Sequence, residues 1–155
     1  MAEGKRMSFT RKAAVNAVNG MMERVQAINE GNAPFPFLNK IRDVILFGSL
    51  VNRPDADKVH DADVAVIIDD DKGKMYEFAE RYPEYCVENN YITHLFSEHI
   101  QMLRYLKGRK YLLSIHTNYE EKDSIMDIAT SDKHIWLIKD YLPCTDVKSE
   151  LQKLL

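Results

Sequence analysis

Two short apolar runs limit the folds open to this chain more than any other feature of its sequence. One is DVILF, residues 43–47, in which four apolar residues in a row are followed by Gly48. The other is DADVAVII, residues 61–68, which is apolar from Val64 onward. A strand with one solvated face alternates apolar and polar residues, so a continuous apolar run predicts a central strand that is covered on both faces.

Helical and strand-like segments alternate along the rest of the chain. The longest helix is expected over Arg11–Glu30, where apolar residues recur at helical spacing and Gly31 stands at the C-cap. The HIWLI segment, residues 134–138, fits a strand and a helical turn equally well. This order predicts a small α/β (α+β) domain in which helices flank a small mixed β-sheet. The other expected elements are a helical turn at residues 37–42, helices at 72–81, 98–106, 123–129 and after an N-cap at Thr145, and strands at 85–97 and 109–117.

Length and composition favour a single domain that spans residues 1–155. The net charge of −3 differs from the broad basic surface of a protein that grips duplex nucleic acid, so a long nucleic acid is not expected as a partner. No stretch reaches the roughly 18 apolar residues of a membrane span. The two cysteines, Cys86 and Cys144, form no C-x-x-C pair, which favours reduced thiols. A cytoplasmic protein without a membrane partner is expected.

Four residues near the apolar runs predict a site for a metal-bound phosphate. Residues i and i+2 of a strand point to the same side, so Asp61 and Asp63 are expected to share a face. Hard oxygen ligands suit Mg²⁺ or Mn²⁺, and paired carboxylates commonly hold two such ions beside a phosphoryl group. Gly48 lets the backbone approach a phosphate closely, and Ser49 adds a hydroxyl donor.

The spacing of these residues resembles the signature of the nucleotidyltransferase superfamily, which has the DNA-polymerase-beta-like fold. Phe47, Gly48 and Ser49 match its first part, and after eleven residues DADV, residues 61–64, matches its second part. The resemblance covers about residues 10–100 and leaves about residues 101–155 as a C-terminal extension that resembles no family. The small size is similar to that of minimal, bacterial-type members, some of which are paired with a helical toxin partner.

The resemblance implies a metal-dependent transferase. It would move a nucleoside monophosphate from a nucleoside triphosphate such as ATP to an acceptor hydroxyl, and it would release pyrophosphate. Gly48 and Ser49 would bind the phosphates, and Asp61 and Asp63 would bind Mg²⁺ or Mn²⁺. The acceptor is not specified by the sequence.

The sequence departs from the family where a third carboxylate is normally the general base on the next strand. The segment expected to form that strand, residues 85–97, offers Glu88 and His94 as candidates. Arg53, in the loop after Ser49, is a further candidate for a phosphate contact. The alternative to an enzyme is a catalytically impaired protein of the same fold, which would act as a binding or regulatory partner subunit, much like an antitoxin. A third hypothesis is an assembly protein that merely shares a D-x-D strand.

Overall fold

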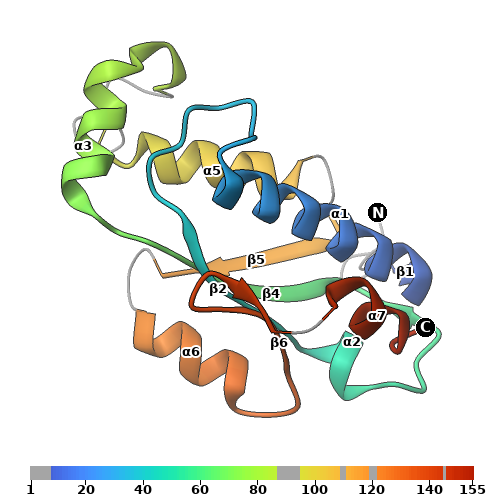
Figure 1. Ribbon diagram of the computed structural model, residues 1–155. Coiled ribbons are helices and arrows are strands. Elements are labelled where there is room, and N and C mark those ends of the chain that lie inside the picture. The colour runs from blue at the N-terminus through green and yellow to red at the C-terminus, as the bar shows by residue number, and fades with distance from the viewer. Residues whose placement is uncertain (1–7, 87–94, 109–110, 119–121, 145) are drawn as a thin grey trace, which may run out of the picture.

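The computed structural model describes residues 8–86, 95–108, 111–118, 122–144 and 146–155. Its main sheet consists of β2 (Ile41–Phe47), β4 (Ala62–Ile68), β5 (Leu113–Thr117), β6 (Ile135–Lys139) and β7 (Leu142–Pro143). The strand order is β5-β4-β2-β6-β7 (Figure 1). Because β4 and β5 are parallel and the other neighbours are antiparallel, the sheet is mixed. A small second sheet pairs β1 (Phe9–Thr10) with β3 (Lys58–Val59).

Helices cover both faces of the main sheet, which confirms the predicted α/β class. In Figure 1, α1 (Arg11–Glu30) and α5 (Ser97–Lys107) lie above the sheet, and α6 (Lys122–Thr130) lies below it. α3 (Lys72–Arg81) packs beside α5, and α7 (Val147–Gln152) packs beside α1. The remaining helices are α2 (Ser49–Asn52) and the 3-10 helix η1 (Pro83–Tyr85). Among the described helices, none is both long and apolar enough to cross a membrane.

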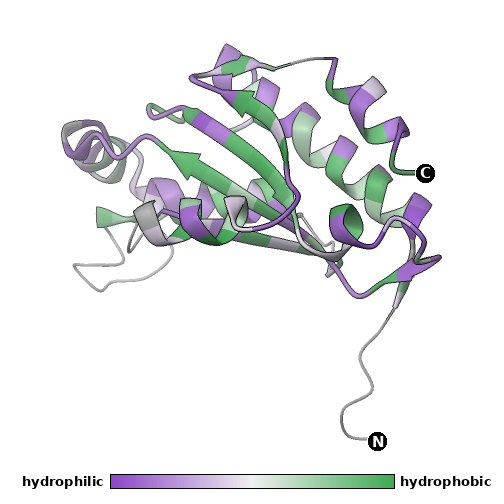
Figure 2. Ribbon diagram, turned by 90° about the horizontal axis from the view of Figure 1, so that it is seen from below, coloured by the Kyte–Doolittle hydropathy of each residue, from purple (hydrophilic) through white to green (hydrophobic). Residues whose placement is uncertain are grey.

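The two apolar runs form the centre of the sheet, as predicted. Val44 and Leu46 of β2 belong to the large buried cluster that includes α1, whereas Ile45 and Phe47 point to the opposite face. There they join Ala65 and residues of α6 in a smaller cluster. Figure 2 shows hydrophobic residues along the central strands. Both faces of β2 are therefore shielded from water by helices, and both of its edges pair with other strands, β4 and β6.

The end of the sheet where β2 begins and β4 ends is closed by two asparagine side chains. Asn29 of α1 accepts a hydrogen bond from the Ile41 N–H at 2.8 Å and donates one to the Ile41 carbonyl at 2.9 Å. Asn118 does the same for Ile68, at 2.9 Å and 2.8 Å. Each amide replaces a missing strand partner, so the backbone groups of both strand ends are satisfied. β2 therefore begins at Ile41, and the helical turn expected at residues 37–42 is wrong.

A buried polar cluster joins α5 to the segment before β2. The Glu98 side chain is fully buried, and its carboxylate accepts hydrogen bonds from the N–H of Leu38 at 2.5 Å, the N–H of Asn39 at 2.9 Å and the Asn39 side-chain amide at 2.6 Å. The neighbouring His99 is also buried, and its Nε2 lies 3.0 Å from the Asp69 carbonyl oxygen. Burial lowers the pKa of His99, and this effect outweighs the raising effect of the nearby Glu98 charge.

Most of the other predicted elements are confirmed. α1 has the predicted bounds, and Gly31 ends it in the left-handed conformation with φ 75°. The HIWLI segment forms β6 rather than a helical turn. The strand expected at residues 85–97 is wrong at its described ends, which belong to η1 and α5, and residues 87–94 lie outside the described part. Thr145 also lies outside it, and Asp146 caps α7.

The burial of His99 predicts that acid destabilises the fold. Because the pKa of His99 is lowered in the folded state, the unfolded chain takes up a proton below about pH 6.5 that the folded chain does not. The free energy of unfolding should therefore decrease as the pH falls below about 6.5. The contribution of His99 to this decrease should end once the pH is below the pKa of His99 in the folded protein. Denaturant unfolding of wild type and His99→Gln between pH 7.5 and 5.5 measures this. His134→Gln, at a histidine that is only partly buried, is the matched control. An equal pH slope in wild type and His99→Gln would contradict the prediction.

The amide of Asn29 is expected to stabilise the fold through the two backbone groups of Ile41. Asn29→Ala leaves that N–H and carbonyl without their partner and should lower the free energy of unfolding by about 1–3 kcal/mol. Gln26→Ala, on the same helix, removes only an exposed contact with Glu30 and should change it by less than about 0.5 kcal/mol. Equal effects of the two substitutions in denaturant unfolding would show that the Ile41 pairing contributes little.

Candidate active site

Gly48 ends β2 and turns the chain directly into α2. Its backbone has φ 79° and ψ −160°, a conformation that is essentially restricted to glycine. The Gly48 carbonyl accepts hydrogen bonds from the N–H groups of Val51 at 3.1 Å and Asn52 at 2.9 Å, which close the first helical turn. Ser49 is therefore the first helical residue. Its N–H and hydroxyl lie at a helix N-terminus, where backbone donors have no partner within the helix.

Gly48 lies against the carboxylate of Asp63. The antiparallel register of β2 and β4 puts Phe47 opposite Asp63, so Gly48 comes beside the start of β4. A Cβ atom on Gly48 would collide with Asp63 Oδ2. The two parts of the sequence motif are thus in contact, and the glycine is needed for this contact as well as for its backbone conformation.

The two aspartates lie at the start of β4. Asp61 precedes the strand and is half-buried, and the Asp63 side chain has 22% of its surface exposed. Ala62, between them, is buried and donates its N–H to the Leu112 carbonyl at 2.6 Å. This bond holds the beginning of β4 beside β5, so the position of both carboxylates depends on the neighbouring strand.

β5 contributes a histidine and a serine that the sequence analysis did not select. The parallel register of β4 and β5 puts Ser114 level with Asp63. His116, two residues further along the same face, places its Nε2 3.1 Å from Asp63 Oδ1 and 3.3 Å from Ser114 Oγ. Its ring centroid lies 5.3 Å from that of Phe47. The Asp63 carboxylate therefore has Gly48 on one side and His116 on the other.

The loop that leaves the site is held by Arg11 of α1. Its guanidinium donates hydrogen bonds to the carbonyls of Leu50 at 2.8 Å, Arg53 at 3.0 Å, Ala56 at 3.2 Å and Leu154 at 2.8 Å. One side chain thus ties α2 and the following loop to the C-terminal segment. The side chain of Arg53 is exposed, and the described ion pair of Asp63 is with His116 rather than with Arg53.

The strand expected to carry the third catalytic group is not the strand beside Asp63. β4 pairs with β2 on one edge and with β5 on the other, and the described part of the chain between β4 and β5 forms α3, η1 and α5. A parallel neighbour requires such a crossover, which explains why the next strand in the sequence comes later than expected. Glu88 and His94 lie outside the described residues. The alternation of Ser114 and His116 in LSIHT was the one signal that could have identified these two residues.

The residues around Gly48 fit a divalent cation bound together with a phosphate. Asp63 supplies hard carboxylate oxygens, and Gly48 leaves room beside its Oδ2. Asp61, two residues earlier at the same end of β4, is the second carboxylate of the motif. Within the described part of the chain, no group of three or more metal-ligating side chains is found. A cation here would take its remaining ligands from phosphate and water.

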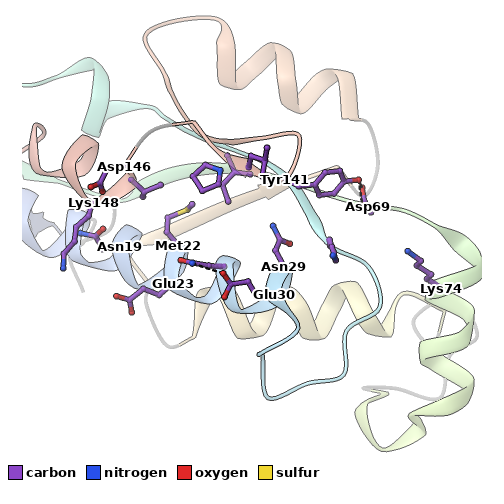
Figure 3. A pocket seen from close by; sticks show the side chains of 16 residues that line it. Asn19, Met22, Glu23, Asn29, Glu30, Asp69, Lys74, Tyr141, Asp146 and Lys148 are labelled. Atoms are coloured by element: carbon purple, nitrogen blue, oxygen red, sulfur yellow. Dashed lines mark hydrogen bonds between the residues drawn. The ribbon is translucent and has the colours of Figure 1, made fainter.

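A separate groove of about 980 Å³ lies at the opposite end of β4, between α1, the β6–β7 hairpin and α7. Figure 3 shows Tyr141 pointing toward Asp69, and its hydroxyl donates to both carboxylate oxygens, at 2.7 Å and 2.8 Å. This contact raises the pKa of Tyr141. The groove wall carries lysines and acids together, among them Lys40, Lys74 and Glu30. None of the motif residues lines it.

Comparisons with known proteins returned no protein-family model, no curated protein and no solved structure that matches this chain.

Gly48→Ala is expected to disrupt the site and to destabilise the fold. The substitution combines a strained backbone, which costs about 1–3 kcal/mol, with the collision at Asp63 Oδ2. Gly31→Ala is the matched control, because Gly31 also has positive φ, 75°, but has nothing within 4 Å of an added Cβ. In denaturant unfolding, Gly48→Ala should lose at least about 1 kcal/mol more than Gly31→Ala, since overpacking costs about 1–3 kcal/mol. Equal losses would argue against a close contact between Gly48 and Asp63.

Proposed function

We propose that this protein is a metal-dependent nucleotidyltransferase with a nucleotidyltransferase-like fold. It would bind a nucleoside triphosphate with Mg²⁺ or Mn²⁺ at Gly48, Ser49, Asp61 and Asp63. It would transfer the nucleoside monophosphate to an acceptor hydroxyl. The substrate class and the metal come from the resemblance of the FGS and DADV segments to that superfamily.

The observation that carries the proposal is the contact of Gly48 with the Asp63 carboxylate. In the sequence these residues belong to two separate segments, and only a specific strand register brings them together. The contact supports a shared site, because a backbone that can approach a phosphate closely then lies beside a carboxylate that can hold the phosphate's counter-ion. A surface turn with solvated aspartates would need neither the glycine nor the close approach.

Each residue has a separate task in the proposed site. The backbone at Gly48 and Ser49, with the Ser49 hydroxyl, would hold the outer phosphates, and Asp61 and Asp63 would hold the cation. When bound, the cation would neutralise charge on the phosphates and polarise the phosphoryl group. Arg11 keeps α2 and the following loop in place through four backbone carbonyls, so it would preserve the phosphate-binding geometry without touching the nucleotide.

In the transfer, one bond at the α-phosphorus forms and another breaks. The acceptor oxygen forms a bond to the α-phosphorus, the bond from that phosphorus to the bridging oxygen breaks, and pyrophosphate leaves with the electron pair. The acceptor proton has to pass to a base. On the described face around Asp63, His116 places an imidazole next to that carboxylate, and imidazole is a common general base. We assign it the position that a third carboxylate holds in the family pattern.

A second candidate function is nucleotide binding without transfer, in a regulatory or partner subunit. The observation that favours it is the histidine in place of an acid beside Asp63. Incubation with a radiolabelled nucleoside triphosphate and candidate acceptors separates the two functions. Label transfer that is lost in Asp63→Asn supports the enzyme, and tight binding without any transfer supports the binding subunit.

Nucleotide binding is expected to depend on the metal and on both aspartates. In isothermal titration with ATP, wild type should bind in the presence of Mg²⁺, and binding should be lost with EDTA. Asp61→Asn and Asp63→Asn should each weaken binding at least about 100-fold, since groups outside a ligand shell already contribute about 10–100-fold. Asp55→Asn removes an exposed aspartate from the loop between the two parts of the motif and should leave the affinity unchanged. Wild type that binds no nucleotide with Mg²⁺ or Mn²⁺ would exclude the proposal.

A further inference from the structure

We infer that this site binds one divalent cation rather than the pair that two strand carboxylates commonly hold, because His116 occupies the side of Asp63 that a second cation would use. The inference rests on the proposed binding of a metal–nucleotide, but it does not depend on transfer. It concerns the number of cations and the role of His116, which the resemblance to the superfamily does not supply.

The two carboxylate oxygens of Asp63 face different neighbours. Oδ2 faces Gly48, where an added Cβ would collide with it, so this oxygen is turned toward the proposed phosphate cradle. Oδ1 faces β5 and lies 3.1 Å from His116 Nε2. A carboxylate that bridges two cations about 3.5–4 Å apart uses both oxygens. Here only the oxygen on the Gly48 side is turned toward a bound nucleotide.

His116 is held in position by several contacts. Its Nε2 is also 3.3 Å from Ser114 Oγ, and its ring packs at 5.3 Å from the Phe47 ring. Ser114 is level with Asp63 in the strand register, so both β5 side chains on this face converge on the same carboxylate. A second cation at Oδ1 would have to displace an imidazole that has three neighbours.

The ligands that β5 offers beside Asp63 also favour a single cation. The described strand β5 reads LSIHT and contributes no carboxylate beside Asp63. On the Gly48 side, the nucleotide phosphates would supply anionic oxygen ligands beside Oδ2. A cation at Oδ1 would meet only imidazole and hydroxyl groups from β5, which suit Mg²⁺ and Mn²⁺ less well than carboxylate does. In addition to the role of base assigned above, His116 therefore positions Asp63. It holds Asp63 so that Oδ2 points to the metal–nucleotide, and it fills the second position with a hydrogen-bonding group.

Mn²⁺ binding tests the inference without relying on catalysis. The protein is titrated with Mn²⁺ in the presence of a non-hydrolysable nucleoside triphosphate analogue, and bound Mn²⁺ is counted by electron paramagnetic resonance. Binding by the Asp61→Asn/Asp63→Asn double variant is subtracted as the contribution of the nucleotide alone. Wild type should bind one Mn²⁺ per chain and show no spectrum of a spin-coupled Mn²⁺ pair.

A carboxylate placed at the β5 position should create the second site. His116→Asp should raise the count from one to two Mn²⁺ per chain and produce the spin-coupled spectrum. The combined substitution Ser114→Asp/His116→Ala adds a carboxylate level with Asp63 and removes the imidazole. It replaces His116→Asp if circular dichroism shows that His116→Asp does not fold. Tyr76→Asp adds the same carboxylate at an exposed position on α3, which follows the opposite end of β4, and should leave the count at one.

The outcomes separate this inference from the proposed function. Two spin-coupled Mn²⁺ ions in wild type would overturn the inference and leave the nucleotidyltransferase proposal in place. Wild type that binds no more Mn²⁺ than the double variant would overturn both. One Mn²⁺ in wild type, with a second ion gained only on adding a carboxylate on β5, supports the single-cation site.

Discussion

The antiparallel pairing of β2 with β4 is the constraint on which the rest of the structure depends. A shift of one residue in this register would turn every side chain of one strand to the other face. Asp63 would then point into the dry layer under α1, and Val64 would point toward His116. The cost of burying the Asp63 carboxylate without a partner opposes this shift. In the observed register Val44 and Leu46 fill one apolar layer, and Ile45 and Phe47 fill the other. The hydrophobic core thereby holds Asp63 beside Gly48.

Polar side chains have different surroundings at the two ends of the sheet. At the end where β2 begins, the Asn29 amide pairs with both backbone groups of Ile41. The buried Glu98 carboxylate there accepts two backbone N–H groups and the Asn39 side-chain amide. These contacts stabilise the strand ends. At the other end, Asp63 keeps 22% of its side-chain surface exposed, and Gly48 leaves space where another residue would have a side chain. This contrast places the candidate chemistry at the Gly48 end.

The structure also explains how a short chain can hold such a site rigidly. Asp63 is fixed by strand pairing on both sides, with Phe47 on β2 and Ser114 on β5. The loop between the two parts of the motif is fixed by a single arginine, since Arg11 donates to four carbonyls from three segments. Strand and loop are thus positioned by contacts from α1, β5 and the C-terminal residues. The last third of the chain supplies β5 and β6, the outer neighbours of the β4–β2 pair.

The sequence by itself determined the elements whose cause is local. Periodicity and the C-cap residue Gly31 define α1, and continuous apolar runs define β2 and β4 as covered strands. It also determined the motif residues Gly48, Ser49, Asp61 and Asp63, because their spacing can be read along the chain. Only the tertiary structure decided that HIWLI is a strand and that β5 lies beside β4. It also brought His116 to Asp63, across 53 positions. Pairing between distant segments depends on how the whole core closes, and no local pattern in LSIHT specifies which strand it will join.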